Sequence, residues 1–209
     1  MRALSDCHLY GILDLGYIQP NECTRVAEQM IEGGVDIIQL RAKKMSILQI
    51  VDLAEQIHWL TSAASTPLIV NDHAEIARRV PVEGVHVGQD DEAIAKVRAA
   101  VSYEIIVGKS THSLEQAGAA ANEGADYIGF GPIFATPTKP DYTAIGLTDI
   151  KKVHVDLALP IFCIGGIKID NLADVIAAGA KRVVIVSGLV KAPDIADYAR
   201  KCKELLCQS

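Results

Sequence analysis

Residues 22–41 read ECTRVAEQMIEGGVDIIQLR, and this stretch contains the pattern on which the fold depends. Apolar residues in its first half recur at spacings of three and four, which predicts an amphipathic helix. The glycine pair Gly33-Gly34 is typical of a chain that leaves a helix through a left-handed residue. The apolar run DIIQLR then predicts a buried strand. One helix therefore leads directly into one strand.

Apolar runs of the same kind recur through the chain: HLYGIL (8–13), DIIQLR (36–41), PLIVN (67–71), GVHV (84–87), EIIVGK (104–109), DYIGF (126–130), IFCIG (161–165) and RVVIVS (182–187). Segments between them, such as SILQIVDLAEQIHWL and SLEQAGAAANEGA, have helical spacing. Eight such units predict an α/β fold, a closed (β/α)₈ TIM barrel, with residues 1–209 forming a single catalytic domain. A doubly wound open sheet is the alternative, but it favours fewer strands and a glycine-rich turn after the first.

The composition limits the classes of partner. Lys and Arg number 20 against 26 Asp and Glu, so the net charge of −6 argues against a nucleic-acid-binding protein. No apolar run approaches the ~20 residues of a membrane span and none resembles a signal peptide, so we expect a cytoplasmic protein without membrane contact. The five cysteines form no CxxC pair, which indicates reduced thiols, with Cys163 a small core residue. The sequence does not specify the oligomeric state and is compatible with a homo-oligomer.

Active sites of TIM barrels lie at the carboxyl ends of the strands, so polar residues there are candidates. The second predicted strand ends with Gln39, Arg41 and Lys43 in alternation, which predicts one amide and two cations on the face that points over the barrel mouth. An anionic ligand would compensate these charges. The alternative is that Arg41 and Lys43 pair with acidic residues of a neighbouring loop.

Carboxylates follow the third and fourth predicted strands. Asp72 and Asp91 would form a pair of hard oxygen ligands on adjacent strands, which favours Mg²⁺ completed by water and phosphate oxygens. Helix capping is the alternative, because Asp72 precedes a predicted helix at Ala74, and Asp90 or Asp91 precedes the helix AIAKVRAA. His86 alternates with core residues and is interpreted as a structural hydrogen-bonding histidine.

The fifth predicted strand adds a hydroxyl and an imidazole. Ser110 could reach the same mouth, and His112 could act as a general acid or base. His112 could equally cap the next helix or face solvent. The sequence leaves its role open.

Glycines follow the last two predicted strands. Gly165-Gly166 and Ser187-Gly188 would leave backbone N–H groups bare in neighbouring loops, which is the position of a monophosphate site in many barrels. Simple tight turns are the alternative.

Residues 128–141, IGFGPIFATPTKPD, run from the sixth strand into a loop with Thr136, Thr138 and Lys139, whose side chains suit anionic oxygens. A solvated surface loop is the alternative. The chain thus has the groups for one diphosphate with magnesium and one monophosphate, which suits an enzyme that joins two phosphorylated substrates and releases pyrophosphate.

Several motifs together resemble the thiamine-phosphate synthase family almost from end to end: YGILD, QLRAK, VND, GVHVGQDD, GKSTH, GADYIGFGPIFATPTK, Gly146-Leu147, IGGI and VVIVSG. The resemblance implies a transferase of thiamine biosynthesis. It would couple 4-amino-2-methyl-5-hydroxymethylpyrimidine diphosphate with 4-methyl-5-(2-hydroxyethyl)thiazole phosphate, giving thiamine phosphate and pyrophosphate.

The resemblance also implies roles for individual residues. Contacts to the pyrimidine diphosphate would come from Gln39, Arg41, Lys43, Asn71, Ser110 and Lys139, of which Arg41, Lys43, Ser110 and Lys139 are the predicted catalytic residues. Asp72 and Asp91 would hold Mg²⁺. The thiazole phosphate would be bound by Thr136, Thr138, Gly166, Val186 and Ser187.

Two positions depart from the family pattern: Leu13-Asp14 stands where Thr-Asp is frequent, and His73 where arginine is common. We therefore leave Asp14 out of the predicted site. Two other functions remain open, a thiazole tautomerase with the same barrel and a barrel without catalysis that binds thiamine precursors to regulate a partner. Retention of QLRAK, both carboxylates and TPTK favours the synthase, because a tautomerase needs no magnesium-diphosphate site.

Overall fold

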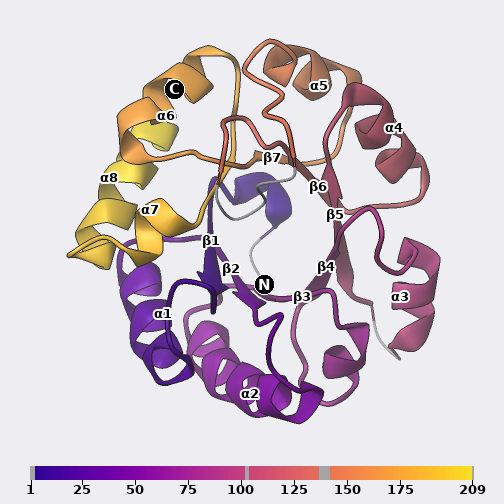
Figure 1. Cartoon of the computed structure of the whole chain (residues 1–209), viewed down its shortest axis with the longest axis vertical. Coiled ribbons are helices and arrows are strands. Elements are labelled where there is room, and N and C mark those ends of the chain that lie inside the picture. The colour runs from indigo at the N-terminus through magenta and orange to yellow at the C-terminus, as the bar shows by residue number, and fades with distance from the viewer. Residues whose placement is uncertain (1–2, 102–103, 137–141, 209) are drawn as a thin grey trace.

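Eight parallel strands close into one barrel in a computed structural model that describes residues 3–101, 104–136 and 142–208 (Figure 1). Each strand pairs with the next along the chain, and β8 pairs with β1. The predicted barrel is confirmed, and each strand overlaps the run predicted for it. Their bounds are β1 Leu9–Asp14, β2 Ile37–Arg41, β3 Leu68–Asn71, β4 Gly84–Val87, β5 Ile106–Thr111, β6 Tyr127–Phe130, β7 Ile161–Cys163 and β8 Val183–Ile185.

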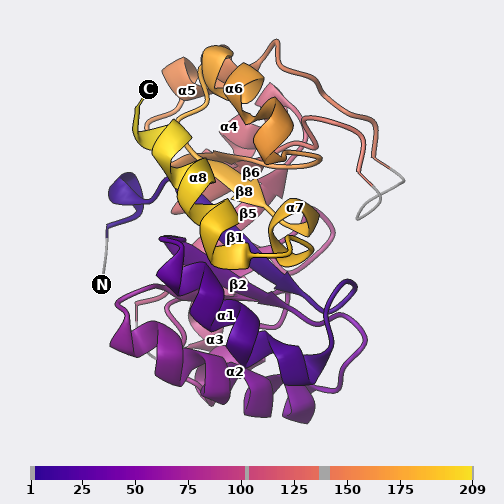
Figure 2. The same cartoon turned by 90° about the vertical axis from the view of Figure 1, so that its left-hand side faces the viewer.

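Helices surround the barrel (Figures 1 and 2). They are α1 Cys23–Glu32, α2 Ile47–Ala63, α3 Ile94–Ala100, α4 Leu114–Asn122, α5 Ile150–Asp156, α6 Ile169–Ala177, α7 Ser187–Val190 and α8 Ile195–Cys207. Short 3₁₀ helices are η1 Leu4–Asp6, η2 Pro20–Glu22 and η3 Ala74–Arg78. The predicted helix at Ala74 is therefore the five-residue η3. Glycines that end helices have the expected left-handed conformation, with φ of +86° at Gly34 and +104° at Gly179.

The apolar core has two layers, because successive strand residues point to opposite faces. The outer layer lies between strands and helices and includes Leu9 and Leu13 of β1. The inner layer fills the barrel with Tyr10, Tyr127 and Phe162, together with shorter apolar side chains. A packed interior of this kind leaves room for a ligand only near one end of the barrel.

The two ends of the barrel differ. We call the amino ends of the strands the lower end and their carboxyl ends the upper end. At the lower end η1 covers the interior, where Leu4 packs against the inner layer (Figures 1 and 2). The upper end is open.

All five cysteines are free thiols, and burial raises the pKa of Cys163 to about 12, as expected for an unreactive core residue. Among the residues that the structure describes, no helix is long and apolar enough to cross a membrane.

Candidate active site

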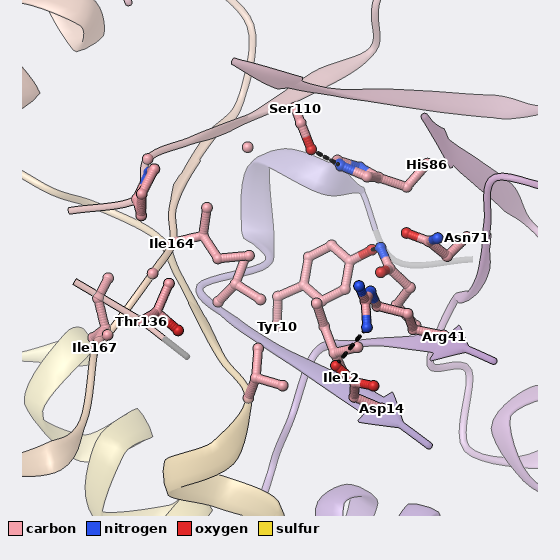
Figure 3. A pocket seen from close by; sticks show the side chains of 18 of the residues that line it. Tyr10, Ile12, Asp14, Arg41, Asn71, His86, Ser110, Thr136, Ile164 and Ile167 are labelled. Carbon is pink, nitrogen blue, oxygen red and sulfur yellow. Dashed lines mark hydrogen bonds and ion pairs between the residues drawn. The ribbon is translucent and has the colours of Figure 1, made fainter. Parts of the chain in front are cut away.

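A pocket opens at the upper end of the barrel (Figure 3). Its wall includes side chains or backbone from the ends of all eight strands. Eight predicted site residues line it: Gln39, Arg41, Asn71, Ser110, Thr136, Gly166, Val186 and Ser187. The sequence therefore identified half of the polar side chains that line this pocket. Thr138 and Lys139 lie outside the described residues.

The end of β2 supplies two of these residues in the predicted alternation. Gln39 is 3% exposed, and its amide nitrogen donates to the Tyr10 hydroxyl at 2.8 Å. Arg41 donates from Nη1 to the buried carboxylate of Asp14 at 2.9 Å (Figure 3). In the described part of the chain this is the only hydrogen bond of the Arg41 guanidinium, so its other N–H groups are available to an anion. Arg41 thus lies in the pocket and is paired with a carboxylate, although this carboxylate ends strand β1, whereas the pairing alternative placed it on a neighbouring loop.

Lys43 lies beyond the pocket wall, with half of its side chain exposed. Its ammonium is 3.4 Å from Asp72 Oδ2. This pairing was the alternative to a ligand contact. An exposed ion pair of this kind contributes less than ~1 kcal/mol, so an incoming anion can compete for the ammonium at little cost.

The two predicted metal ligands, Asp72 and Asp91, interact through their side chains. Neither carboxylate lines the pocket, although Asp72 directly follows Asn71, which does. Burial and the neighbouring Asp91 carboxylate raise the pKa of Asp72, while Lys43 lowers it. Asp91 also accepts a hydrogen bond from the Gly88 backbone N–H at 2.6 Å. The φ angle of Asp72 is +67°, a left-handed conformation that costs roughly 1 kcal/mol for a residue other than glycine. Asp72 therefore has both a neighbouring carboxylate and a strained backbone conformation.

Capping does not explain these carboxylates. The residue before η3 is His73 and the residue before α3 is Ala93, and neither helix has a side-chain cap. The capping alternative is wrong for Asp72, Asp90 and Asp91. Two adjacent carboxylates without a capping role fit the donor set of Mg²⁺, which one or two carboxylates often hold.

The opposite wall of the pocket is formed by the loops after β7 and β8, with Thr136 nearby. Gly165 and Gly166 have φ of +99° and +67°. Among the described residues, neither of their backbone N–H groups donates a hydrogen bond. Neutral donors of this kind bind a phosphate without a counter-ion. This wall is therefore neutral, whereas the wall formed by β1 and β2 contains the charged side chains of Asp14 and Arg41.

The two histidines of the pocket have hydrogen-bond partners. His86 contacts the Tyr127 hydroxyl through Nδ1 at 3.0 Å and Ser110 Oγ through Nε2 at 2.9 Å. This confirms a hydrogen-bonding histidine, although His86 also lines the pocket. His112 contacts the Gly131 carbonyl through Nδ1 and lies in the pocket wall. His112 does not cap α4, because Ser113 does so. Its place in the pocket wall also means that it is not fully exposed.

Six polar wall residues are not among the predicted site residues: Tyr10, Asp14, His86, Thr111, His112 and Tyr127. Of these, the sequence indicated His112 as a candidate acid or base and His86 as a structural histidine. Tyr10 and Tyr127 lie on the same inward faces as Ile12 and Gly129, so the period-two alternation used for β2 could have found them. Asp14, which we left out of the predicted site, lies two residues beyond Ile12 on that face.

The sequence profile described as thiamine monophosphate synthase matches residues 9–189. The chain belongs to this family. It is 41% identical to the thiamine-phosphate synthase of Chloroflexus aurantiacus over 96% of this chain and 93% of the relative. It is 40% identical to the protein of the same name from Pelotomaculum thermopropionicum, covering 99% and 95%.

A solved structure agrees with this family assignment. Thiamine phosphate pyrophosphorylase from Pyrococcus furiosus superimposes with a TM-score of 0.90 at 27% identity, covering 99% of this chain and 98% of that one. The thiamine monophosphate synthase family therefore accounts for both the barrel and the order of motifs along it.

Proposed function

We propose that the chain is a thiamine-phosphate synthase, a transferase in which residues 1–209 act as one catalytic domain. The reaction joins the methylene carbon of 4-amino-2-methyl-5-hydroxymethylpyrimidine diphosphate to the nitrogen of 4-methyl-5-(2-hydroxyethyl)thiazole phosphate. The C–O bond to the diphosphate breaks and its electrons leave with pyrophosphate. The observation that carries this proposal is the pair of neighbouring carboxylates Asp72 and Asp91. They follow β3 and β4 at the end of the barrel where the pocket with the neutral glycine wall opens.

Mg²⁺ fits the carboxylate pair. Asp72 and Asp91 would hold it, because a divalent cation would offset both the burial and the Asp91 interaction that raise the pKa of Asp72. When bound, the ion supplies positive charge to the departing diphosphate. Lys43 lies 3.4 Å from Asp72, so its ammonium is close enough to share the same phosphate oxygens.

The remaining diphosphate contacts come from the wall beside this pair. Arg41 offers N–H donors that Asp14 does not use, and Asn71 and Ser110 offer neutral hydrogen bonds. These groups stabilise the negative charge that grows as the C–O bond breaks. We assign Lys139 the same role from the family resemblance.

The thiazole phosphate would lie at the opposite wall. This part of the pocket is lined by Gly166, Val186 and Ser187. The backbone N–H of Gly166 donates no hydrogen bond to another described residue. Thr136 lines the pocket near this wall, beside Ile167 (Figure 3), and Thr138 follows two residues later in the sequence. Binding at both walls would hold the thiazole nitrogen close to the methylene carbon. The reaction of the two bound substrates then avoids much of the entropic cost of bringing them together from solution.

The chemistry needs no protein nucleophile. Dissociation leaves a pyrimidine-stabilised carbocation, which the thiazole nitrogen captures. Ile12, Ile164 and Ile167 line the pocket with apolar surface, so they would exclude the water that could otherwise capture the cation (Figure 3). The five free thiols are those expected of a protein that works in the cytoplasm.

One assay tests this function. The purified chain is mixed with both substrates and Mg²⁺, and thiamine phosphate and pyrophosphate are measured. We expect both products in equal amounts and none with excess EDTA. Isomerisation of a thiazole phosphate without metal would indicate the tautomerase instead, and binding of either substrate without turnover would indicate a regulatory barrel.

A pair of variants separates the site from general charge effects. Arg41→Ala removes a guanidinium from the pocket, and we expect turnover to fall by about a hundredfold. Lys201→Ala is the control, since Lys201 forms an exposed ion pair with Asp197 on α8, away from the pocket. Its turnover should equal that of the unmodified protein.

A further inference from the structure

Five polar side chains from five strands form one continuous series of hydrogen bonds through the barrel interior. The Gln39 amide nitrogen lies 2.8 Å from the Tyr10 hydroxyl, which lies 3.0 Å from the Tyr127 hydroxyl. Tyr127 contacts His86 Nδ1 at 3.0 Å, and His86 Nε2 contacts Ser110 Oγ at 2.9 Å. We call this series the Gln39–Ser110 relay. All five residues line the pocket. Figure 3 labels Tyr10, His86 and Ser110 among them.

The direction of the relay follows from its first member. The amide nitrogen of Gln39 can only donate, so the Tyr10 oxygen accepts. The Tyr10 proton then needs an acceptor, and in the described part of the chain the Tyr127 oxygen is the only other group bonded to that hydroxyl. Tyr10 therefore donates to Tyr127. A buried hydroxyl without an acceptor would cost about 1–3 kcal/mol, which excludes the opposite order while the Gln39 nitrogen donates.

The same argument fixes the imidazole. Tyr127 has accepted from Tyr10, so its own proton goes to His86 Nδ1. A neutral imidazole with an acceptor at Nδ1 has its hydrogen at Nε2, and this hydrogen points to Ser110 Oγ. The Ser110 oxygen thus accepts from His86. Its own proton is left to donate elsewhere, and the side chain lines the pocket.

The barrel interior keeps the relay neutral and rigid. Burial raises the pKa of both Tyr10 and Tyr127, so both remain phenols. Their rings lie edge-on to Phe162, with centroids 5.4 and 5.5 Å away. Gly108 of β5 leaves the space for the Tyr127 ring, because a Cβ there would lie 2.1 Å from Tyr127 Cζ. These contacts hold the hydroxyls in place before any ligand arrives.

We propose that Tyr10, Tyr127 and His86 are positioning residues that fix the His86 imidazole with its hydrogen on Nε2 and thereby make Ser110 a hydrogen-bond donor to the substrate. The inference rests on the proposed function for the identity of that substrate, the pyrimidine diphosphate. An acceptor-rich diphosphate or ring nitrogen requires a donor at this point. If the relay ran the other way, Ser110 would donate to His86 and offer the substrate only lone pairs.

The tautomer can be measured without any substrate. We suggest ¹⁵N-detected NMR of the imidazole nitrogens of the full chain at a pH of about 8.5, where an ordinary histidine is neutral. The His86 signals among the six histidines are identified with the His86→Gln variant. We expect hydrogen on Nε2 in the unmodified protein. Hydrogen on Nδ1 would overturn the proposal, whether or not the chain makes thiamine phosphate.

Two variants test the cause of that tautomer. Tyr127→Phe keeps the ring and removes the hydroxyl, so His86 should become a mixture of both tautomers. Tyr198→Phe is the matched control, because the Tyr198 hydroxyl accepts from the Ile169 N–H outside the relay. The control should keep the hydrogen on Nε2. An unchanged tautomer in Tyr127→Phe would contradict the inference, and Tyr10→Phe repeats the test if Tyr127→Phe does not fold.

Kinetics test whether the relay acts through Ser110. We expect Tyr127→Phe to raise KM for the pyrimidine diphosphate about tenfold while changing KM for the thiazole phosphate little. In a Ser110→Ala background the same change should have no further effect, because the hydroxyl that the relay orients is absent. Additive losses in the double variant would show a merely structural role for Tyr127 and would overturn the proposal. Absence of turnover in the unmodified chain would instead refute the proposed function.

Discussion

Two carboxylates at opposite ends of the barrel have opposite surroundings. At the lower end, Asp36 is fully buried and accepts hydrogen bonds from the backbone N–H groups of His8 and Leu9 and from the Lys203 ammonium. At the upper end, Asp72 lies beside a second carboxylate, in a strained backbone conformation, with one exposed lysine nearby. A carboxylate surrounded by donors holds the fold together. One that lies beside another carboxylate is stabilised by a cation, which is what we expect at a metal site.

The largest effect expected from this comparison is at the lower end. Asp36→Ala leaves two backbone N–H groups and the Lys203 ammonium without their acceptor, so we expect a loss of ~3 kcal/mol in the free energy of unfolding. Urea denaturation followed by circular dichroism measures it. Turnover per folded molecule should stay the same. A loss below ~1 kcal/mol would show that Asp36 is not structural.

The matched change at the upper end should act on turnover. Asp72→Asn keeps the shape of the side chain and removes its charge, and we expect turnover to fall about a hundredfold, equivalent to ~2.7 kcal/mol of transition-state stabilisation. The free energy of unfolding should be unchanged or slightly higher, because repulsion from Asp91 is removed. Steady-state pyrophosphate release measures the first quantity and urea denaturation the second. A stability loss comparable to that of Asp36→Ala would show that Asp72, like Asp36, stabilises the fold, and would contradict its assignment to a ligand site.

The lysine partners sharpen the same contrast. Lys203 is largely buried against Asp36, whereas half of the Lys43 side chain is exposed beside Asp72. Lys203→Met should cost ~1–2 kcal/mol of stability and leave turnover unchanged. Lys43→Met should cost less than ~1 kcal/mol of stability and reduce turnover about tenfold. Equal changes in stability and in turnover for the two variants would contradict the assignment of Lys203 to the fold and of Lys43 to the site.

The smallest effect concerns pH. Burial lowers the pKa of His154 on α5, so the folded chain binds a proton there less readily than the unfolded chain does. Stability from this group is therefore fully present above the ordinary histidine pKa of about 6.5 and is lost as the pH falls below it. Urea midpoints between about pH 5 and 8 measure the loss. It should shrink in His154→Gln, and an unchanged profile in that variant would assign the acid sensitivity to other groups.

The sequence predicted the barrel well because local patterns determine its elements. Each strand is an apolar run, and the helix ends at Gly34, Gly124 and Gly179 have the left-handed conformation that glycine adopts without strain. The element after β3 was the exception. Its five residues form a 3₁₀ helix, since so short a segment cannot complete several α-helical turns.

The site was predictable only in part, for a physical reason. Alternation along β2 placed Gln39 and Arg41 correctly, because the signal lies within one strand. The partnership of Arg41 with Asp14 joins two strands, and the Gln39–Ser110 relay joins five. Such contacts depend on the closure and register of the barrel, which no local pattern specifies.

Calorimetric binding of inorganic pyrophosphate tests most directly the claim that the carboxylate pair at the upper end forms a magnesium-diphosphate site. With Mg²⁺ present, we expect one site per chain, with affinity reduced at least tenfold in Asp72→Asn and unchanged in Lys201→Ala. With EDTA, binding should be lost. Equal affinity with and without Mg²⁺, or an unchanged affinity in Asp72→Asn, would contradict the account.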